Sequence, residues 1–326
     1  MVPGAGHKPV VWVLLLVFLI FTFQQAVAAD DEGIKTSTNL QLQLSSMPEA
    51  KFILTQSFGF PFLQGTNPLT RDNNITADLS AEVSPISLNG KGEIIFTPAA
   101  FFLLSGGGKA GSGWNIPLGK GIGLNTPEGD FTRGTSKPRN AEIIGNAFDG
   151  LYWSGWGAGT LQFDLGAIIP GDWTHVLFQT RQEFRYHAYT RAGAGDCWIF
   201  ENDFGENQNG WIYYAVYVLG YHMPQSPVLD TIAFMAELEK ILYNTPGGDY
   251  WGEHLGYWIF SGLFNFSVNP RFGMTLALQM HTRRNFGTSY FYDNTHYYKD
   301  FELQSGEGQR RILFYRAALM LNYKLR

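Results

Sequence analysis

Alternation of apolar and polar residues is the dominant pattern of this chain beyond residue 38. Successive side chains of a β-strand point to opposite faces, so the alternation predicts strands with one apolar and one polar face. Twelve segments show it: 39–46, 51–60, 74–84, 86–96, 101–111, 156–169, 173–188, 210–222, 230–243, 257–268, 271–286 and 310–325. If Pro48 and Pro98 mark bulges inside longer strands, the count falls to ten and remains even.

The last segment illustrates the two faces. One face is apolar: Leu313, Tyr315, Ala317, Leu319, Leu321, Tyr323 and Leu325. The other face is more polar: Phe314, Arg316, Ala318, Met320, Asn322, Lys324 and Arg326. The first face suits lipid or a core and the second suits water. Because a slip of one residue would exchange the faces, the pairing register is well determined.

Segment 226–244 fits either a helix or a strand. Ser226 could cap a helix that has Pro227 in its first turn. The same segment also alternates, with Ile232 and Phe234 opposed to Glu237. We favour the strand, because without it the strands at 210–222 and 257–268 would be joined at the wrong ends.

The connections between segments are of two kinds. Short turns are predicted at 97–99, 170–172 and 269–271, whereas 112–155, 189–209, 244–256 and 287–309 are long, polar segments. From the fifth segment onward short and long connections alternate, which puts all short turns at one end. Outer-membrane barrels have this arrangement, with periplasmic turns and extracellular loops.

The N-terminus has the features of a secretory signal peptide. His7 and Lys8 precede an apolar run of 14 residues at 10–23, and Ala26-x-Ala28 supplies a cleavage site. The run is shorter than the ~20 residues that a membrane-spanning helix needs. We therefore expect a signal peptide at 1–28 and a single barrel domain at 29–326.

Composition narrows the function classes. Only 16% of the residues are charged, against about 25% in ordinary soluble domains. The net charge is -5 and no Lys/Arg-rich run occurs, so nucleic acid is not an expected partner. Cys197 is the only cysteine, which excludes an intramolecular disulfide.

Together these features resemble a bacterial outer-membrane β-barrel. Aromatic residues near the segment ends fit the interface girdles of that class: Tyr152, Trp153, Trp156, Trp173, Trp211, Tyr213, Tyr257, Trp258, Tyr290 and Tyr323. The runs at 96–101 and 111–115 resemble those of spirochaete-type outer-membrane proteins. The resemblance implies an all-β, up-and-down antiparallel barrel surrounded by outer-membrane lipid. The C-terminus departs from the usual pattern, because it ends on Arg326 and not on an aromatic residue.

A secreted soluble β-sandwich or jelly roll is the alternative fold. Segments such as 173–188 and 271–286 exceed the ~5 to 6 residues of an average soluble strand, which favours the barrel. Closure into a barrel also leaves no strand edge exposed.

The polar face of such a barrel would line its lumen. The candidate lumen-lining residues are Lys91, Glu93, Asp164, Arg181, Glu183, Arg185, Glu237, Glu239, Arg283 and Arg316. They could form the lining of a water-filled channel. Alternatively, the arginines could pair with Asp164 and other carboxylates and brace a plugged interior.

Motifs for catalysis or cofactor binding are absent from the sequence. It contains neither Gly-x-Ser-x-Gly nor His-Glu-x-x-His, and we expect no cofactor, no metal and no enzymatic activity. His175, His187 and His281 fall on the polar face, where we expect them to pair with neighbours. The favoured function is a narrow, porin-like channel for small polar solutes. A surface-exposed structural or adhesin barrel, with the aromatic loop at 287–301 gripping a partner, and an outer-membrane hydrolase remain as alternatives.

Overall fold

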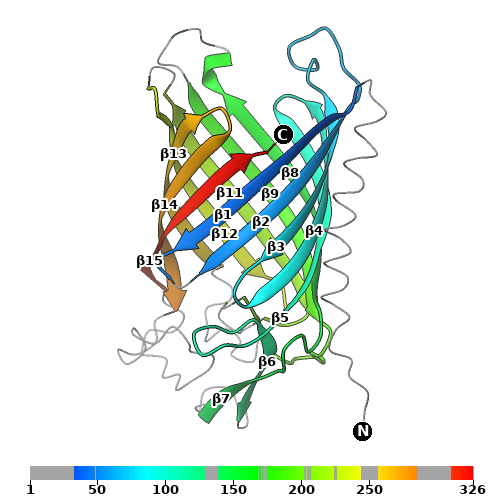
Figure 1. The fold of residues 1–326 in the computed structure, drawn as a ribbon, viewed down its shortest axis with the longest axis vertical. Coiled ribbons are helices and arrows are strands. Elements are labelled where there is room, and N and C mark those ends of the chain that lie inside the picture. Colours follow the sequence, from blue (N-terminus) through cyan, green and yellow to red (C-terminus); the bar gives the residue numbers. More distant parts are fainter. Residues whose placement is uncertain are drawn as a thin grey trace.

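The protein folds as a closed β-barrel with almost no helix (Figure 1). The computed structural model describes residues 33–47, 49–128, 139–167, 169, 171, 175–201, 203, 207–223, 226–243, 256–284 and 310–325. The barrel strands are β1 (Lys35–Ser45), β2 (Ala50–Pro61), β3 (Asn74–Val83), β4 (Ser87–Ala99), β5 (Phe102–Gly113), β8 (Tyr152–Asp164), β9 (Val176–Tyr189), β11 (Gly210–His222), β12 (Leu229–Ile241), β13 (Tyr257–Asn269), β14 (Phe272–Arg284) and β15 (Arg310–Lys324).

All neighbouring strands are antiparallel, and β1 pairs with β15 to close the ring. The twelve predicted segments correspond one to one to the twelve barrel strands, so the predicted all-β, up-and-down barrel is confirmed and the ten-strand alternative is wrong. The helical alternative for 226–244 is also wrong, because β12 pairs along its length with β11 and β13. No helix among the described residues is long and apolar enough to cross a membrane.

From β5 onward, long and short connections lie at opposite ends of the barrel, whereas the short turns between β1 and β2 and between β3 and β4 lie at the long-loop end. The start of β1 and the end of β15 lie at the end that has the turns between β4 and β5 and between β13 and β14. At the other end, a separate sheet is formed by β6 (Ile122–Glu128), β7 (Arg139–Ile144) and β10 (Trp198–Phe200). We did not predict this sheet, since its strands are short and lie inside the two segments that we expected to be loops.

The outer wall of the barrel is apolar and exposed. Its large side chains include Ile94, Leu104, Leu161, Phe163, Phe178, Phe184, Leu219, Phe234, Leu278 and Met280, each at least 43% exposed. Such a belt suits hydrocarbon and would be unstable in water. At the long-loop end, Tyr186 lies between Trp153 and Trp211, with ring centroids 5.4 and 5.5 Å apart, as expected for an interface girdle.

Three residues that we assigned to the girdle face inward. Tyr152 is buried, Trp156 contacts Glu93 from β4, and Tyr257 is hydrogen-bonded to His281. The reason is the alternation itself: Tyr152 and Trp153 are adjacent, so only one of them can face lipid. Trp173 and Tyr290 lie outside the described residues.

A β-bulge in β15 changes the faces near the start of that strand. The pairing of β14 with β15 shifts after Gln279 and Arg316, so that Met280 pairs with Phe314. Ile312 and Phe314 are 56% and 64% exposed on the outside, and Leu313 pairs with the inward-facing His281. The predicted assignment of Leu313 and Tyr315 to the lipid face was therefore wrong, because one extra residue reverses the alternation.

The predicted strand at 156–169 is shorter than expected at its C-terminal end. β8 ends at Asp164, and Leu165–Ala167 form a single 3-10 turn, η1. The Asp164 carboxylate accepts the backbone N–H of Gly166 at 2.8 Å, which turns the chain out of the sheet.

Leu278→Arg tests the assignment of the outer wall. Leu278 lies in the middle of β14 and is 46% exposed, so an arginine there should lower the free energy of unfolding in lipid vesicles by about 2–4 kcal/mol. Tyr323→Arg, at the end of β15, is the matched control and should cost at most about 1 kcal/mol. Equal losses in reversible denaturant titrations would show that depth in a bilayer does not matter.

Candidate functional site

One row of paired residues organises the inner wall. Glu93 of β4, Gly107 of β5, Trp156 of β8 and Arg185 of β9 follow one another in register. A Cβ atom on Gly107 would lie 2.6 Å from the indole of Trp156 and 2.5 Å from the carbonyl oxygen of Gly92. Glycine is therefore required at this position so that the indole can lie across β5 and donate to Glu93 at 3.4 Å.

Cations surround the indole of Trp156. Lys91 Nζ lies 5.3 Å from its ring centroid, and the guanidinium of Arg185 lies 5.8 Å away. Arg185 is also 5.6 Å from the ring of Tyr214 on β11, so it sits beside two aromatic rings. These distances fit cation–π attraction, which holds the charged groups against the wall.

Two carboxylates connect these cations. Glu93 pairs with Lys91 at 2.9 Å and with Arg181 at 3.1 Å. Glu183 pairs with Arg181 at 2.8 Å and with Arg185 at 2.6 Å, and its side chain is only 2% exposed. The two arginines are 26% and 31% exposed, so the carboxylate lies beneath them and the guanidinium groups face the interior.

The strands from β11 to β15 carry acids, phenols and an arginine on the inner wall. Tyr214 donates to Glu237, and Glu239 lies two residues further along β12. Tyr257 and His281 Nδ1 are 2.6 Å apart, as expected for a histidine that pairs with a neighbour. Arg316 pairs with Glu49, donates to Gln279 at 2.6 Å and lies 4.7 Å from the ring of Tyr315.

None of the ion pairs among the described barrel strands crosses the lumen. In the ring of twelve strands, opposite walls are six strands apart, whereas Arg181 and Glu93 are three apart and Lys109 and Glu82 are two apart. A strand spacing of ~4.8 Å and a tilt of ~40° give a backbone diameter of roughly 24 Å. In a circular ring of this diameter, facing side chains of roughly 7 Å each would span about 14 Å.

The predicted lumen-lining residues lie in several separate places in the barrel. Lys91, Glu93, Arg181, Glu183 and Arg185 form one cluster on β4 and β9, whereas Glu237 and Glu239 lie on β12, two strands beyond β9, and Arg316 lies on β15. Asp164 stands apart at the short-turn end, 3.6 Å from His175, so the predicted pairing of the arginines with Asp164 was wrong. Arg283 belongs to β14, but its side chain lies outside the described residues.

Sequence reasoning missed a second charged cluster near the long-loop end. Lys51 and Lys109 lie 2.9 and 3.4 Å from Glu201, and Lys109 also pairs with Glu82 at 2.8 Å. Burial raises the pKa of Glu201, but the two ammonium groups and a hydrogen bond from Ser87 outweigh burial and lower the pKa to about 2. The strand pattern assigned Glu82 to the polar face, but nothing local could place Glu201, which follows β10 in a long connection.

Aromatic side chains from the same connection enter the mouth of the barrel. Phe200 stacks on Tyr152 with ring centroids 4.1 Å apart, and Trp198 packs against Tyr152 and Tyr189. Trp198 and Tyr189 are each 1% exposed. The described residues of the segment 194–206, which contain β10, therefore form a lid that covers part of the long-loop end.

Within the described residues, no group of three His, Cys, Asp or Glu side chains is arranged to hold a metal ion. The aromatic segment at 287–301, considered for partner binding, lies outside the described residues.

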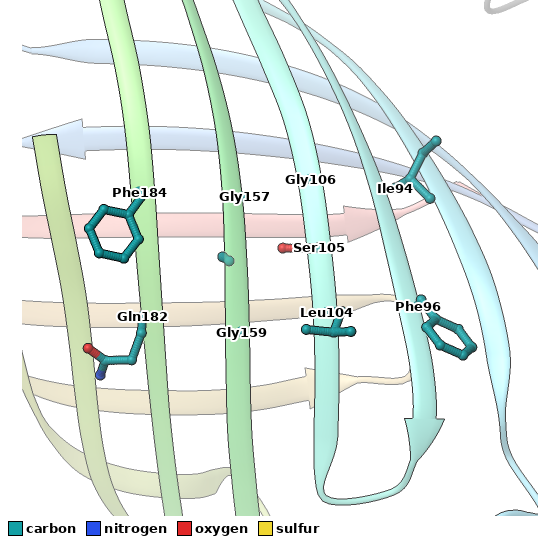
Figure 2. Close-up of a pocket in the computed structure, with 10 residues that line it drawn as sticks. Ile94, Phe96, Leu104, Ser105, Gly106, Gly157, Gly159, Gln182 and Phe184 are labelled. Carbon is teal, nitrogen blue, oxygen red and sulfur yellow. The ribbon is translucent and has the colours of Figure 1, made fainter. Parts of the chain in front are cut away.

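A shallow groove on the outer wall marks the reverse side of the glycine-rich strands. Figure 2 shows Leu104 and Phe184 beside the stretch of β5 and β8 where glycines leave the backbone uncovered. A Cβ atom on Gly157 would meet nothing within 4 Å. Glycines of the outer wall thus tolerate a methyl group that Gly107 on the inner wall cannot accommodate.

Gly107→Ala and Gly157→Ala form a matched pair. The first substitution should displace the indole of Trp156 and lower the free energy of unfolding by about 1–3 kcal/mol. The second should change it by less than about 0.5 kcal/mol. Denaturant titrations of both variants check this, and a neutral Gly107→Ala would contradict the packing of Trp156 across β5.

Known proteins were compared with the chain by sequence and by structure. No protein-family model and no curated protein sequence matches the chain. Among solved structures, it is similar to a KdgM porin (8% identity, TM-score 0.37, covering 89% of this chain and 99% of the other) and to the NanC porin (8%, 0.39, 88% and 100%). It is also similar to OmpT, an outer membrane protein of Vibrio cholerae (7%, 0.31, 89% and 97%). The closed ring of twelve antiparallel strands and the apolar outer wall are those of a membrane-spanning β-barrel.

Proposed function

We propose that the protein is a narrow channel through which small polar solutes cross the outer membrane. One observation carries the proposal: the charged side chains are held along the wall and not across the lumen. Each ion pair of the described barrel strands joins strands no more than three apart in the ring. A circular ring would thus leave a passage of about 10 Å, which, lined by both signs of charge, suits hydrated ions and small polar molecules.

The sign of the charges in the lining differs from strand to strand. Lys91 on β4 and Arg181 and Arg185 on β9 face the interior, and Glu237 and Glu239 lie on β12, two strands beyond β9. Charges of both signs around this part of the ring orient dipolar solutes in a narrow passage without strongly excluding either sign of ion. The lid narrows the long-loop end, so we expect a small conductance with spontaneous closures.

Planar lipid bilayers provide the test of this proposal. Purified mature protein should give discrete conductance steps in 1 M KCl, with weak selectivity between K⁺ and Cl⁻. The absence of conductance at any voltage, also after removal of the lid residues 194–206, would refute the channel. It would favour the alternative of a structural barrel with a closed lumen, for which the aromatic contacts of Trp198 and Phe200 are the supporting observation.

Substitution of the two arginines tests their place in the lining. Each charge at ~10 Å from a permeating ion contributes about 0.4 kcal/mol in water. Two such charges acting in opposite directions on K⁺ and Cl⁻ total about 1.7 kcal/mol, which a Debye length of ~10 Å reduces to about 0.6 kcal/mol. Arg181→Gln with Arg185→Gln should therefore raise the K⁺ to Cl⁻ permeability ratio about threefold, measured from the reversal potential in a salt gradient. The same variant should unfold at a lower temperature, because Glu183 loses both partners.

Arg191→Gln is the matched control for these arginines. Its guanidinium is 58% exposed and pairs with Asp149 on the lid side of the barrel. Neither selectivity nor thermal stability should change measurably. An equal shift in selectivity for both variants would show that the wall arginines do not line the conducting path.

A further inference from the structure

The contacts of Glu201 describe a complete binding site for a carboxylate. One oxygen accepts hydrogen bonds from Ser87 Oγ at 2.6 Å and from Asn89 Nδ2 at 2.8 Å. The other oxygen accepts from Lys51 Nζ at 2.9 Å and from Lys109 Nζ at 3.4 Å. All four donors belong to the barrel wall, on β2, β4 and β5, and only the carboxylate comes from the lid.

The charge of the wall residues requires an anion at this position. Lys51 and Lys109 share a single wall carboxylate, Glu82, at 3.7 and 2.8 Å. Two positive charges and one negative charge leave an excess of one positive charge in a partly buried site, where Lys109 is 18% exposed. Because an unpaired charge in such a place is costly, Glu201 leaves readily only when another anion replaces it.

The backbone of Glu201 has an unfavourable conformation. Glu201 has a φ angle of 53°, in the left-handed region that residues other than glycine seldom occupy. Its backbone N–H donates to the carbonyl of Gly121 at 2.9 Å, which links the lid to the segment leading into β6. Glu201 thus occupies the site on the wall in a strained backbone conformation.

We propose that Ser87, Asn89, Lys51 and Lys109 form a binding site for solutes that carry a carboxylate, and that Glu201 is an exchangeable occupant that latches the lid. This inference deepens the proposed function, on which its physiological role rests, by naming the substrate class. A solute carboxylate that enters from the long-loop end replaces Glu201 and keeps the cluster neutral. The freed lid then uncovers the mouth of the barrel.

Because Glu201 is covalently attached to the lid, its effective concentration sets the concentration of free carboxylate that is needed to replace it. A short chain segment presents its ligand at an effective concentration in the millimolar range or above. With a Kd of about 1 mM for the vacated site and an effective concentration of about 10 mM for Glu201, a free carboxylate displaces Glu201 at roughly 10 mM, about tenfold above the concentration that fills a site without Glu201.

Acetate is a suitable probe, and the experiment needs no conducting channel. In Glu201→Gly, which accepts the positive φ angle, the site is vacated without backbone strain. Line broadening of [¹³C]acetate should show millimolar binding to this variant in micelles at pH 7, and at least tenfold weaker binding to the wild type. Glu201→Gly combined with Lys109→Met should abolish the binding, and acetamide should broaden with none of the proteins.

Hydrogen exchange of the lid provides the second readout. In the wild type, acetate should accelerate exchange of the Trp198 and Phe200 amides at least fivefold, whereas equal concentrations of NaCl or acetamide should not. Equal acetate binding to all three proteins, or no binding to Glu201→Gly, would overturn the site. Binding without faster exchange would overturn the latch. Each result is independent of conductance, so a failure here is distinguishable from a failure of the channel.

Discussion

The hydrogen bonds between β1 and β15 are the constraint on which the rest of the structure depends. In a bilayer, no water is available to backbone N–H and C=O groups, so a spanning sheet is stable only when its two edge strands pair. The register from Asn39 with Lys324 to Ser45 with Ala318 supplies this closure. Once the ring is closed, the alternation of side chains fixes one face toward lipid and the other toward the interior.

Closure also explains why polar groups are concentrated inside. The interior of a ring of twelve strands is too wide for apolar side chains to fill it, so charged groups remain there only where neighbours support them. Gly107 makes room for Trp156, the indole then reaches Glu93, and Glu93 and Glu183 hold three cations against the wall. The absence of a side chain at Gly107 on β5 thus sets the position of the indole on β8 and of the charges on β4 and β9.

Sequence predicted the fold well because strand pairing in a barrel is local. Apart from the pairing of β1 with β15, each barrel strand pairs with the barrel strands that precede and follow it in the sequence. The short strands β6, β7 and β10 lie in the connections between barrel strands and form a separate sheet. Alternation and turn spacing therefore specify the topology of the barrel. The bulge beside Tyr315 could not be predicted, since the extra residue has an ordinary sequence and shows only against its partner strand. Lys109 was missed because it lies in a glycine-rich run, and Glu201 because its contacts are more than 90 residues distant along the chain.

Accessibility to water along β9 is the most direct test of the account. Single cysteines would be placed at positions 179–186 in a Cys197→Ser background and exposed, in proteoliposomes, to a water-soluble maleimide. The account predicts reaction at Gln179, Arg181 and Arg185, which face the interior, and resistance at Thr180, Gln182 and Phe184, which face lipid. Uniform resistance would contradict a hydrated lumen, and uniform reaction would contradict a lipid-facing outer wall.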